Sequence, residues 1–137
     1  MKKPEKVTID RTHWGRGKLF ASDTGCSCAA GFLLRTMGFE PPALDGIGNV
    51  AVLHQSTVDL IRETLGLMPY DNFFTEVYMV NDGRNFSPLE MREKRLVKAF
   101  AKVGIELEFT GSYEDGVLGS FGNPKPIIPY DAPLGGY

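Results

Sequence analysis

The amino-acid sequence predicts an α+β fold, in which a small antiparallel sheet packs against three to four short helices. Three observations lead to this prediction: a β-branched run near the N-terminus, a helix-capping signal at residues 87–90, and strict apolar alternation at 105–109. The chain has 137 residues, of which 42% are hydrophobic and 23% charged, as in folded globular proteins. We expect one domain over residues 1–110, followed by an irregular tail at 111–137, rich in proline and glycine, that docks on the body or on a neighbouring subunit.

The N-terminal part of the chain is expected to form a strand and then a hairpin or tight turn. Residues 6–20 contain the β-branched run followed by Trp14, and glycines at positions 15 and 17 permit a bend. The Ser22-Asp23-Thr24-Gly25 stretch has the composition of a turn. A turn therefore leads directly into the pair of cysteines that follows.

Residues 28–37 are predicted to form a short, buried helix. Their apolar side chains point to nearly all sides, and Gly38 supplies a helix stop. The hydroxyl of Ser27, or that of Thr24 one turn earlier, is the expected cap. After this helix, Pro41-Pro42 predicts an extended exit, and residues 45–48 predict a flexible loop.

A second helix is expected over residues 57–65, with Ser56 as its cap. Residues 72–81 fit either a strand or a helix capped by Asp71 or Asn72, because short apolar runs are compatible with both periodicities. We favour the helix for this segment.

The clearest helix start in the chain is Ser87-Pro88-Leu89-Glu90. A serine cap, a proline at the first helical position and a glutamate that reaches back form a capping box. Gly104 ends this helix, and the alternation at 105–109 predicts a strand that buries one face. These elements form a helix–strand unit at the end of the domain.

Composition and charge argue against several classes of protein. The formal net charge is −2, so the chain lacks the positive field needed for general nucleic-acid binding. No apolar run follows the N-terminal lysines, and no stretch approaches the length of a membrane span, so we expect a cytoplasmic protein with no membrane contact. Cys26 and Cys28 are the two cysteines, which cannot form a disulfide framework, and we expect free thiols.

Several short motifs occur in order along the chain. They are Trp14-Gly15, Leu19-Phe20, Cys28-Ala29-Ala30-Gly31-Phe32, Asn81-Asp82, Arg92-Glu93 and the run 104–109. This order resembles a family of small uncharacterised proteins from phages and bacterial mobile elements. Within the resemblance, Cys28 matches the second of the family's paired cysteines and Ser27 replaces the first. The resemblance covers residues 8–109 and implies a phage-type origin and the cytosol of a host cell, but it brings no established activity.

The cysteine turn, residues 25–31, is the main candidate for a small-molecule site. Small side chains at the start of a helix leave backbone N–H groups open to an anion such as a phosphate, and nearby cations can add charge. The candidate ligand-binding residues are Arg11, Trp14, Arg16, Lys18, Ser27, Cys28, Asn81, Asp82 and Arg84. The competing interpretation is that the small residues allow close packing, that residues 81–84 shape a loop, and that Trp14 is a core residue.

The sequence contains no complete catalytic signature and predicts no metal and no cofactor. The spacing of Cys26 and Cys28 is too short for the usual pair of zinc ligands. A nucleophilic Cys28 would need His13 or His54 as its base, and nothing in the sequence places either histidine beside it.

We therefore expect a non-catalytic phage accessory protein that inhibits or sequesters a host protein or a small phosphorylated, nucleotide-type signal, for example in counter-defence. The alternative is a structural or assembly role, in which the C-terminal tail joins copies in a phage particle or a homo-oligomer. A small cysteine-dependent hydrolase is the third hypothesis.

Overall fold

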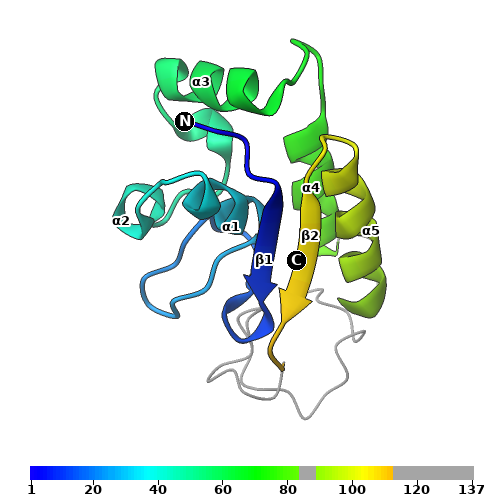
Figure 1. The fold of residues 1–137 in the computed structure, drawn as a ribbon. Coiled ribbons are helices and arrows are strands. Elements are labelled where there is room, and N and C mark those ends of the chain that lie inside the picture. The colour runs from blue at the N-terminus through cyan, green and yellow to red at the C-terminus, as the bar shows by residue number, and fades with distance from the viewer. Residues whose placement is uncertain (84–88, 113–137) are drawn as a thin grey trace.

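Two strands from distant parts of the chain pair side by side in the sheet. A computed structural model describes residues 1–83 and 89–112. In it, β1 (Lys6–Asp10) pairs with β2 (Glu106–Thr110) in parallel, from Lys6 opposite Glu106 to Asp10 opposite Thr110 (Figure 1). The predicted antiparallel sheet is therefore wrong. Parallel neighbours need a crossover connection, and here the described helices lie in the chain between the two strands.

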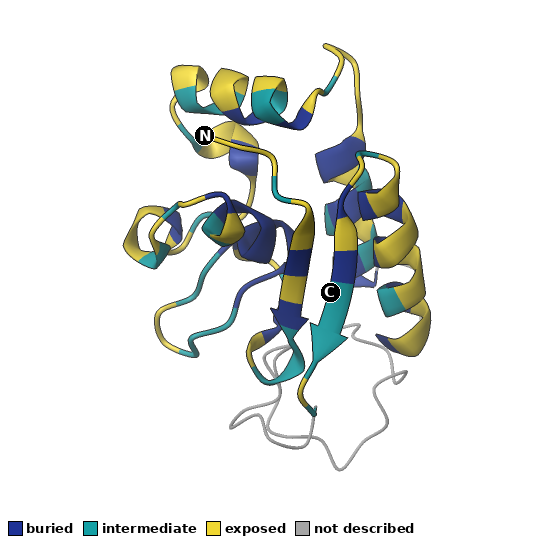
Figure 2. Cartoon of the chain, viewed as in Figure 1, coloured by how far each residue is buried: buried dark blue, intermediate teal, exposed yellow. Residues whose placement is uncertain are grey.

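The sheet has one apolar face and one charged face. Val7 and Ile9 of β1 are buried, and the register places Leu107 and Phe109 of β2 beside them. On the opposite face, Lys6 contacts the carboxylates of Glu106 and Glu108. Figure 2 shows the resulting alternation of buried and exposed bands along β1. The strand predicted at residues 105–109 is thus confirmed, with Leu107 on the apolar face and Glu106 and Glu108 on the charged one.

Helices pack against the apolar face of the sheet. Helix α1 (Ala29–Thr36) contacts β1, α5 (Leu89–Ala101) contacts β2, and α4 (Phe73–Asp82) packs against both helices. The shorter α2 (Pro41–Leu44), the 3₁₀ turns η1 (Arg11–His13) and η2 (Val50–Val52), and α3 (Gln55–Leu65) complete the described fold (Figure 1). The helices predicted at 28–37, 57–65 and 72–81 are confirmed, each within two residues at either end. None of the described helices has the length and apolar character needed to cross a membrane.

Two local expectations in the first half of the chain are wrong. Pro41 and Pro42 begin α2 rather than an extended segment, because the first helical turn needs no N–H donor from its residues. The loop expected at residues 45–48 is present, and it makes hydrogen bonds from Gly46 N to Phe20 O at 2.9 Å and from Leu19 N to Ile47 O at 2.7 Å. The cap of α3 is His54, whose Nδ1 accepts from the backbone N–H of Ser56 at 3.2 Å.

The start of α4 settles the choice between its two expected caps. Asn72 occupies the cap position but makes no side-chain cap bond. The carboxylate of Asp71 accepts instead from the N–H of Phe73 at 2.7 Å. The capping serine and proline predicted before α5 lie outside the described residues, as does the tail from residue 113 onward, together with the assembly role expected of it.

Close packing of α1 depends on one glycine. A Cβ atom added at Gly31 would lie 1.9 Å from the carbonyl oxygen of Leu19. The neighbouring Ala29 and Ala30 are also completely buried. The small residues of the cysteine turn therefore let the helix approach the backbone of residues 18–20, as the packing interpretation of the sequence holds.

Gly31→Ala is expected to destabilise the fold by about 2 kcal/mol or more, because the backbone of Leu19 must move away from the added methyl group. Helix propensity alone predicts the opposite, a gain of roughly 0.5–1 kcal/mol. The measurement is the free energy of unfolding in urea.

Gly66→Ala is the matched control, since that glycine ends α3 at a positive φ of 70° with open space around it. It should lose about 1–2 kcal/mol from backbone strain. A Gly31→Ala variant as stable as the natural chain would contradict the proposed close approach.

Candidate functional site

A buried asparagine connects α4 to the cysteine turn. Asn81 is completely buried, and its Oδ1 accepts hydrogen bonds from Trp14 Nε1 at 2.6 Å and from the backbone N–H of Ala29 at 2.8 Å. Its Nδ2 donates to Gly15 O at 3.0 Å and to Asp82 Oδ1 at 3.1 Å. All the hydrogen-bonding capacity expected of one side-chain amide is therefore engaged inside the protein.

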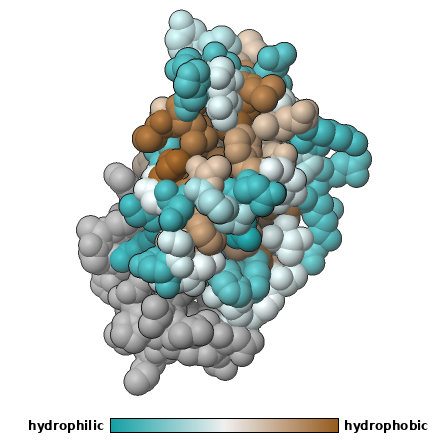
Figure 3. Space-filling model, turned by 90° about the vertical axis from the view of Figure 1, so that its left-hand side faces the viewer, coloured by the Kyte–Doolittle hydropathy of each residue, from teal (hydrophilic) through white to brown (hydrophobic). Residues whose placement is uncertain are grey.

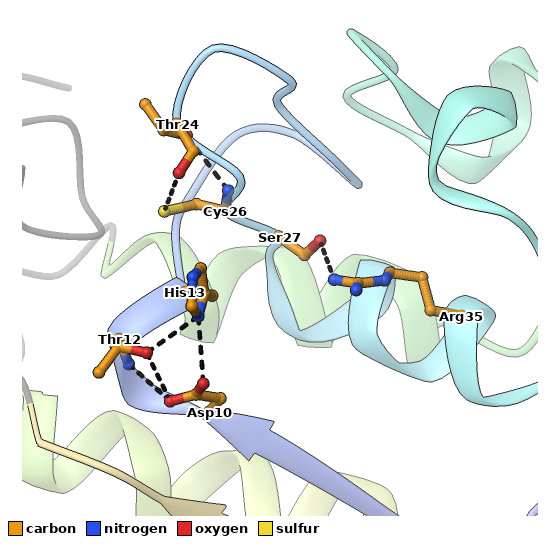
Figure 4. Close-up of polar contacts among 7 residues, drawn as sticks. All are labelled: Asp10, Thr12, His13, Thr24, Cys26, Ser27 and Arg35. Carbon is orange, nitrogen blue, oxygen red and sulfur yellow. Dashed lines mark hydrogen bonds and ion pairs between the residues drawn. The ribbon is translucent and has the colours of Figure 1, made fainter. Parts of the chain in front are cut away.

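The same amide caps α1, which makes the expected caps wrong. Cys28 occupies the cap position of α1 without a side-chain cap bond, and the oxygen of Asn81 receives the first helical N–H. Ser27 Oγ accepts instead from the guanidinium of Arg35 at 3.2 Å, and Thr24 Oγ1 accepts from Cys26 N at 3.2 Å (Figure 4). An asparagine more than fifty residues away thus caps this helix in place of the expected neighbouring serine or threonine.

Protein groups occupy the position predicted for an anion. The N–H of Cys28 donates to Lys18 O at 2.9 Å, and that of Ala29 donates to Asn81. Ala29, Ala30 and Gly31 are all buried, so bulk solvent does not reach the first turn of the helix. The geometry therefore gives no support to a phosphate bound at these backbone amides.

The predicted cations are directed to different parts of the molecule. Arg11 donates from Nε and Nη2 to the carboxylate of Glu93 at 2.9 and 2.7 Å, and from Nη1 to Gly111 O at 3.1 Å. Lys18 Nζ donates to Gly46 O, after α2, at 3.3 Å. Arg11 therefore ties the end of β1 to α5 and to the end of β2, rather than facing the cysteine turn beside Lys18.

Three of the other predicted site residues form a buried group. Trp14, Ser27 and Cys28 are buried around Asn81, and Asp82 accepts from Gly17 N at 3.1 Å. Trp14, Ser27 and Cys28 are brought together, but as part of the core, whereas Asp82 is half-buried. Arg16 is half-buried, and Arg84 lies outside the described residues.

The two cysteines differ in their access to solvent. Cys28 is buried, and this burial raises the pKa of its thiol to about 12. Cys26 is half-buried, its Sγ donates to Thr24 O at 3.8 Å, and burial also raises its pKa. Cys28 is therefore in a poor position to act as the nucleophile of a hydrolase.

A polar cluster beside Cys26 was not singled out from the sequence. His13 Nδ1 lies 3.1 Å from Asp10 Oδ2 and 2.9 Å from Thr12 Oγ1, and Asp10 Oδ1 accepts from the Thr12 hydroxyl at 2.8 Å (Figure 4). Burial acts to raise the pKa of Asp10, but the hydrogen bonds from Thr12 and His13 outweigh it and lower that pKa. The spacing of Asp10 and His13 is compatible with one helical turn, which is the signal that sequence reading could have used.

The cluster does not form a catalytic relay with the thiol. A parallel bridge between Trp14 and Ser27 places His13 next to Cys26 along the two backbones. The Cys26 thiol nevertheless donates to the carbonyl of Thr24, so the hydrogen bond that a cysteine–histidine pair needs is not made. Among the residues that the structure describes, no group of three or more His, Cys, Asp or Glu side chains is arranged to hold a metal ion.

No protein-family model, no curated protein and no solved structure matches this chain. The resemblance to phage proteins is therefore still an expectation from sequence motifs.

Asn81→Ala is expected to lower the free energy of unfolding by about 3 kcal/mol or more, because it leaves the Trp14 and Ala29 donors buried without an acceptor. Trp14 fluorescence during urea unfolding measures this loss. Asn72→Ala, an exposed asparagine at the start of the same helix, is the control and should change stability by less than about 0.5 kcal/mol. An equal decrease in the free energy of unfolding of the two variants would contradict the stabilising role of the Asn81 hydrogen bonds.

Iodoacetamide should modify Cys26 and leave Cys28 unmodified in the native protein, since Cys28 is buried and its pKa is raised. Mass spectrometry should show one adduct in buffer and two in urea. Because the pKa of Cys26 is also raised, its native reaction rate should reach a plateau at a higher pH than in urea.

The native adduct should disappear in Cys26→Ser and persist in Cys28→Ser. Rapid native modification of Cys28 would contradict the burial described here.

Proposed function

We propose that this chain is a non-catalytic binding protein that recognises a protein partner through an apolar surface around η2. This η2 surface consists of Ile47, Ala51, Val52 and Leu53. Val52 is 71% exposed, Ala51 is exposed, and the other two are half-buried. Figure 3 shows the side of the molecule that carries α2 and η2, with apolar residues gathered in its upper part. This exposed apolar segment is the observation that carries the proposal.

The η2 turn is fixed to the body of the protein before any partner arrives. The hydroxyl of Tyr78, on α4, accepts from Val50 N at 2.8 Å. The side chain of Asn49 accepts from Ala51 N at 2.8 Å, and the backbone of the turn closes with a bond from Val52 N to Asn49 O at 3.0 Å. A partner would therefore meet an ordered apolar surface, and little conformational entropy would be lost on binding.

Exposed apolar residues occur singly on most proteins, and a single one needs no explanation. Here two exposed and two half-buried apolar residues lie within residues 47–53, a segment that is fixed by hydrogen bonds. Interfaces between proteins bury such apolar centres inside a polar rim. Helix α3, which begins directly after this segment, supplies exposed polar side chains at Gln55, Ser56 and Asp59.

The closed start of α1 favours a protein partner over a small phosphorylated signal. A phosphate would need backbone N–H groups or a cluster of cations, and the described structure directs Arg11 and Lys18 to separate partners. Within this proposal, the partner is a protein of a bacterial host and binding inhibits or sequesters it. That part rests on the sequence resemblance alone.

Val52→Asn should weaken partner binding at least tenfold, because an amide without a hydrogen-bond partner would be buried at the centre of the interface. Tagged natural chain and variant are compared for the host proteins they retain, identified by mass spectrometry. The affinity of each purified candidate is then measured by calorimetry.

Met91→Asn, on the exposed face of α5, is the matched control. A true partner is retained by the natural chain and by this control, and is lost by Val52→Asn. Should every retained protein bind the two variants equally well, the η2 surface is not the binding site.

A further inference from the structure

The outer edge of β2 presents unpaired backbone groups. Glu106 N donates to Glu5 O at 2.9 Å, so Glu106 and Glu108 direct their N–H and C=O groups toward β1. Successive residues of a strand direct these groups to opposite edges, and those of Leu107 and Phe109 therefore point away from β1. Within residues 1–83 and 89–112, no other strand pairs with this edge.

An open groove runs along the same edge. Val97 and Ala101 of α5 form one wall, and residues 104–107 form the other. The groove has a volume of about 360 Å³, and Val97 on its wall is 39% exposed. Figure 1 shows α5 beside β2 on the side away from β1. An unpaired strand edge next to an apolar wall is the arrangement that accepts an added strand.

Charge on the other face of the sheet indicates which strand would fit. The side chains of Glu106 and Glu108 lie on the face of β2 opposite the helices. If a strand were added at this edge, its side chains on that face would lie beside these two glutamates. Opposite charges in such cross-strand positions stabilise, and like charges destabilise. A second copy paired antiparallel about Leu107 would set Glu106 against Glu108, so self-pairing of β2 is disfavoured.

We propose that the outer edge of β2 binds an extended segment of a partner protein as a third strand of the sheet. The segment places alternate apolar side chains against Val97 and Ala101, and places lysine or arginine beside Glu106 and Glu108. This edge lies on a different part of the molecule from the η2 surface. The proposal therefore stands beside the proposed function and does not depend on it.

The test uses the full chain and a synthetic seven-residue peptide that alternates lysine and valine, with both ends blocked. Amide hydrogen exchange, followed by NMR, reports on the edge residue by residue. Saturating peptide should slow the exchange of Leu107 and Phe109 at least tenfold. The amides of Glu106 and Glu108, which already bond to β1, should change little.

Two peptides and two variants serve as controls. An alternating glutamate–valine peptide, and a lysine–valine peptide methylated on the backbone nitrogens that would face β2, should both bind at least tenfold more weakly. Val97→Asn should weaken binding of the lysine–valine peptide by a similar factor, while Val52→Asn should leave it unchanged. The two variants therefore distinguish a failure of the proposed η2 surface from a failure of the proposed β2 edge.

Three results would overturn the proposal. The first is that the amides of Leu107 and Phe109 are already protected in the free chain, which would mean that the edge is occupied. The second is peptide binding without added protection of these two amides. The third is equal binding of the lysine and glutamate peptides.

Discussion

The fold depends on the side-chain amide of Asn81. Its oxygen holds both the indole of Trp14 and the first N–H of α1, and its nitrogen holds the backbone at Gly15. Three segments that are far apart in the chain thus meet at one buried polar group. In a low-dielectric interior such a network rigidifies the core when every member is satisfied, and it is costly when one member is lost.

Ring and cation contacts extend this network from Trp14 to the sheet. The ring of Trp14 lies 5.0 Å from that of Phe109 on β2, and the guanidinium of Arg11 lies 5.7 Å from the Phe109 ring on its way to Glu93 of α5. Asn81 therefore connects α4 to α1, and Trp14 connects Asn81 to Phe109 of β2. Arg11 then connects Phe109 to α5. This explains why residues that look like ligand-binding groups in the sequence are used for internal structure.

Local signals in the sequence predict the helices well and the sheet poorly. Glycines at the ends of α3 and α4, and the alternation that ends in Phe109, act within a few residues and are readable. The partner of β2 lies a hundred residues away, so alternation identifies a strand without identifying its neighbour or its direction. The role of Asn81 had a readable signal, since it follows Phe73 and Val77 at four-residue intervals on the buried face of α4. No signal in the sequence identifies Trp14 and Ala29 as the hydrogen-bonded partners of Asn81.

The parallel pairing of β1 and β2 has a consequence for how the protein is made. Synthesis proceeds from the N-terminus, so Val7 and Ile9 leave the ribosome long before Leu107 and Phe109 exist to cover them. The start of α1 likewise waits for Asn81, fifty-two residues later. Contacts of such long range slow folding, because loop closure precedes the favourable interactions. The nascent chain therefore carries an unpaired apolar strand while the hundred residues between β1 and β2 are made, and completes this core only after β2 has been made.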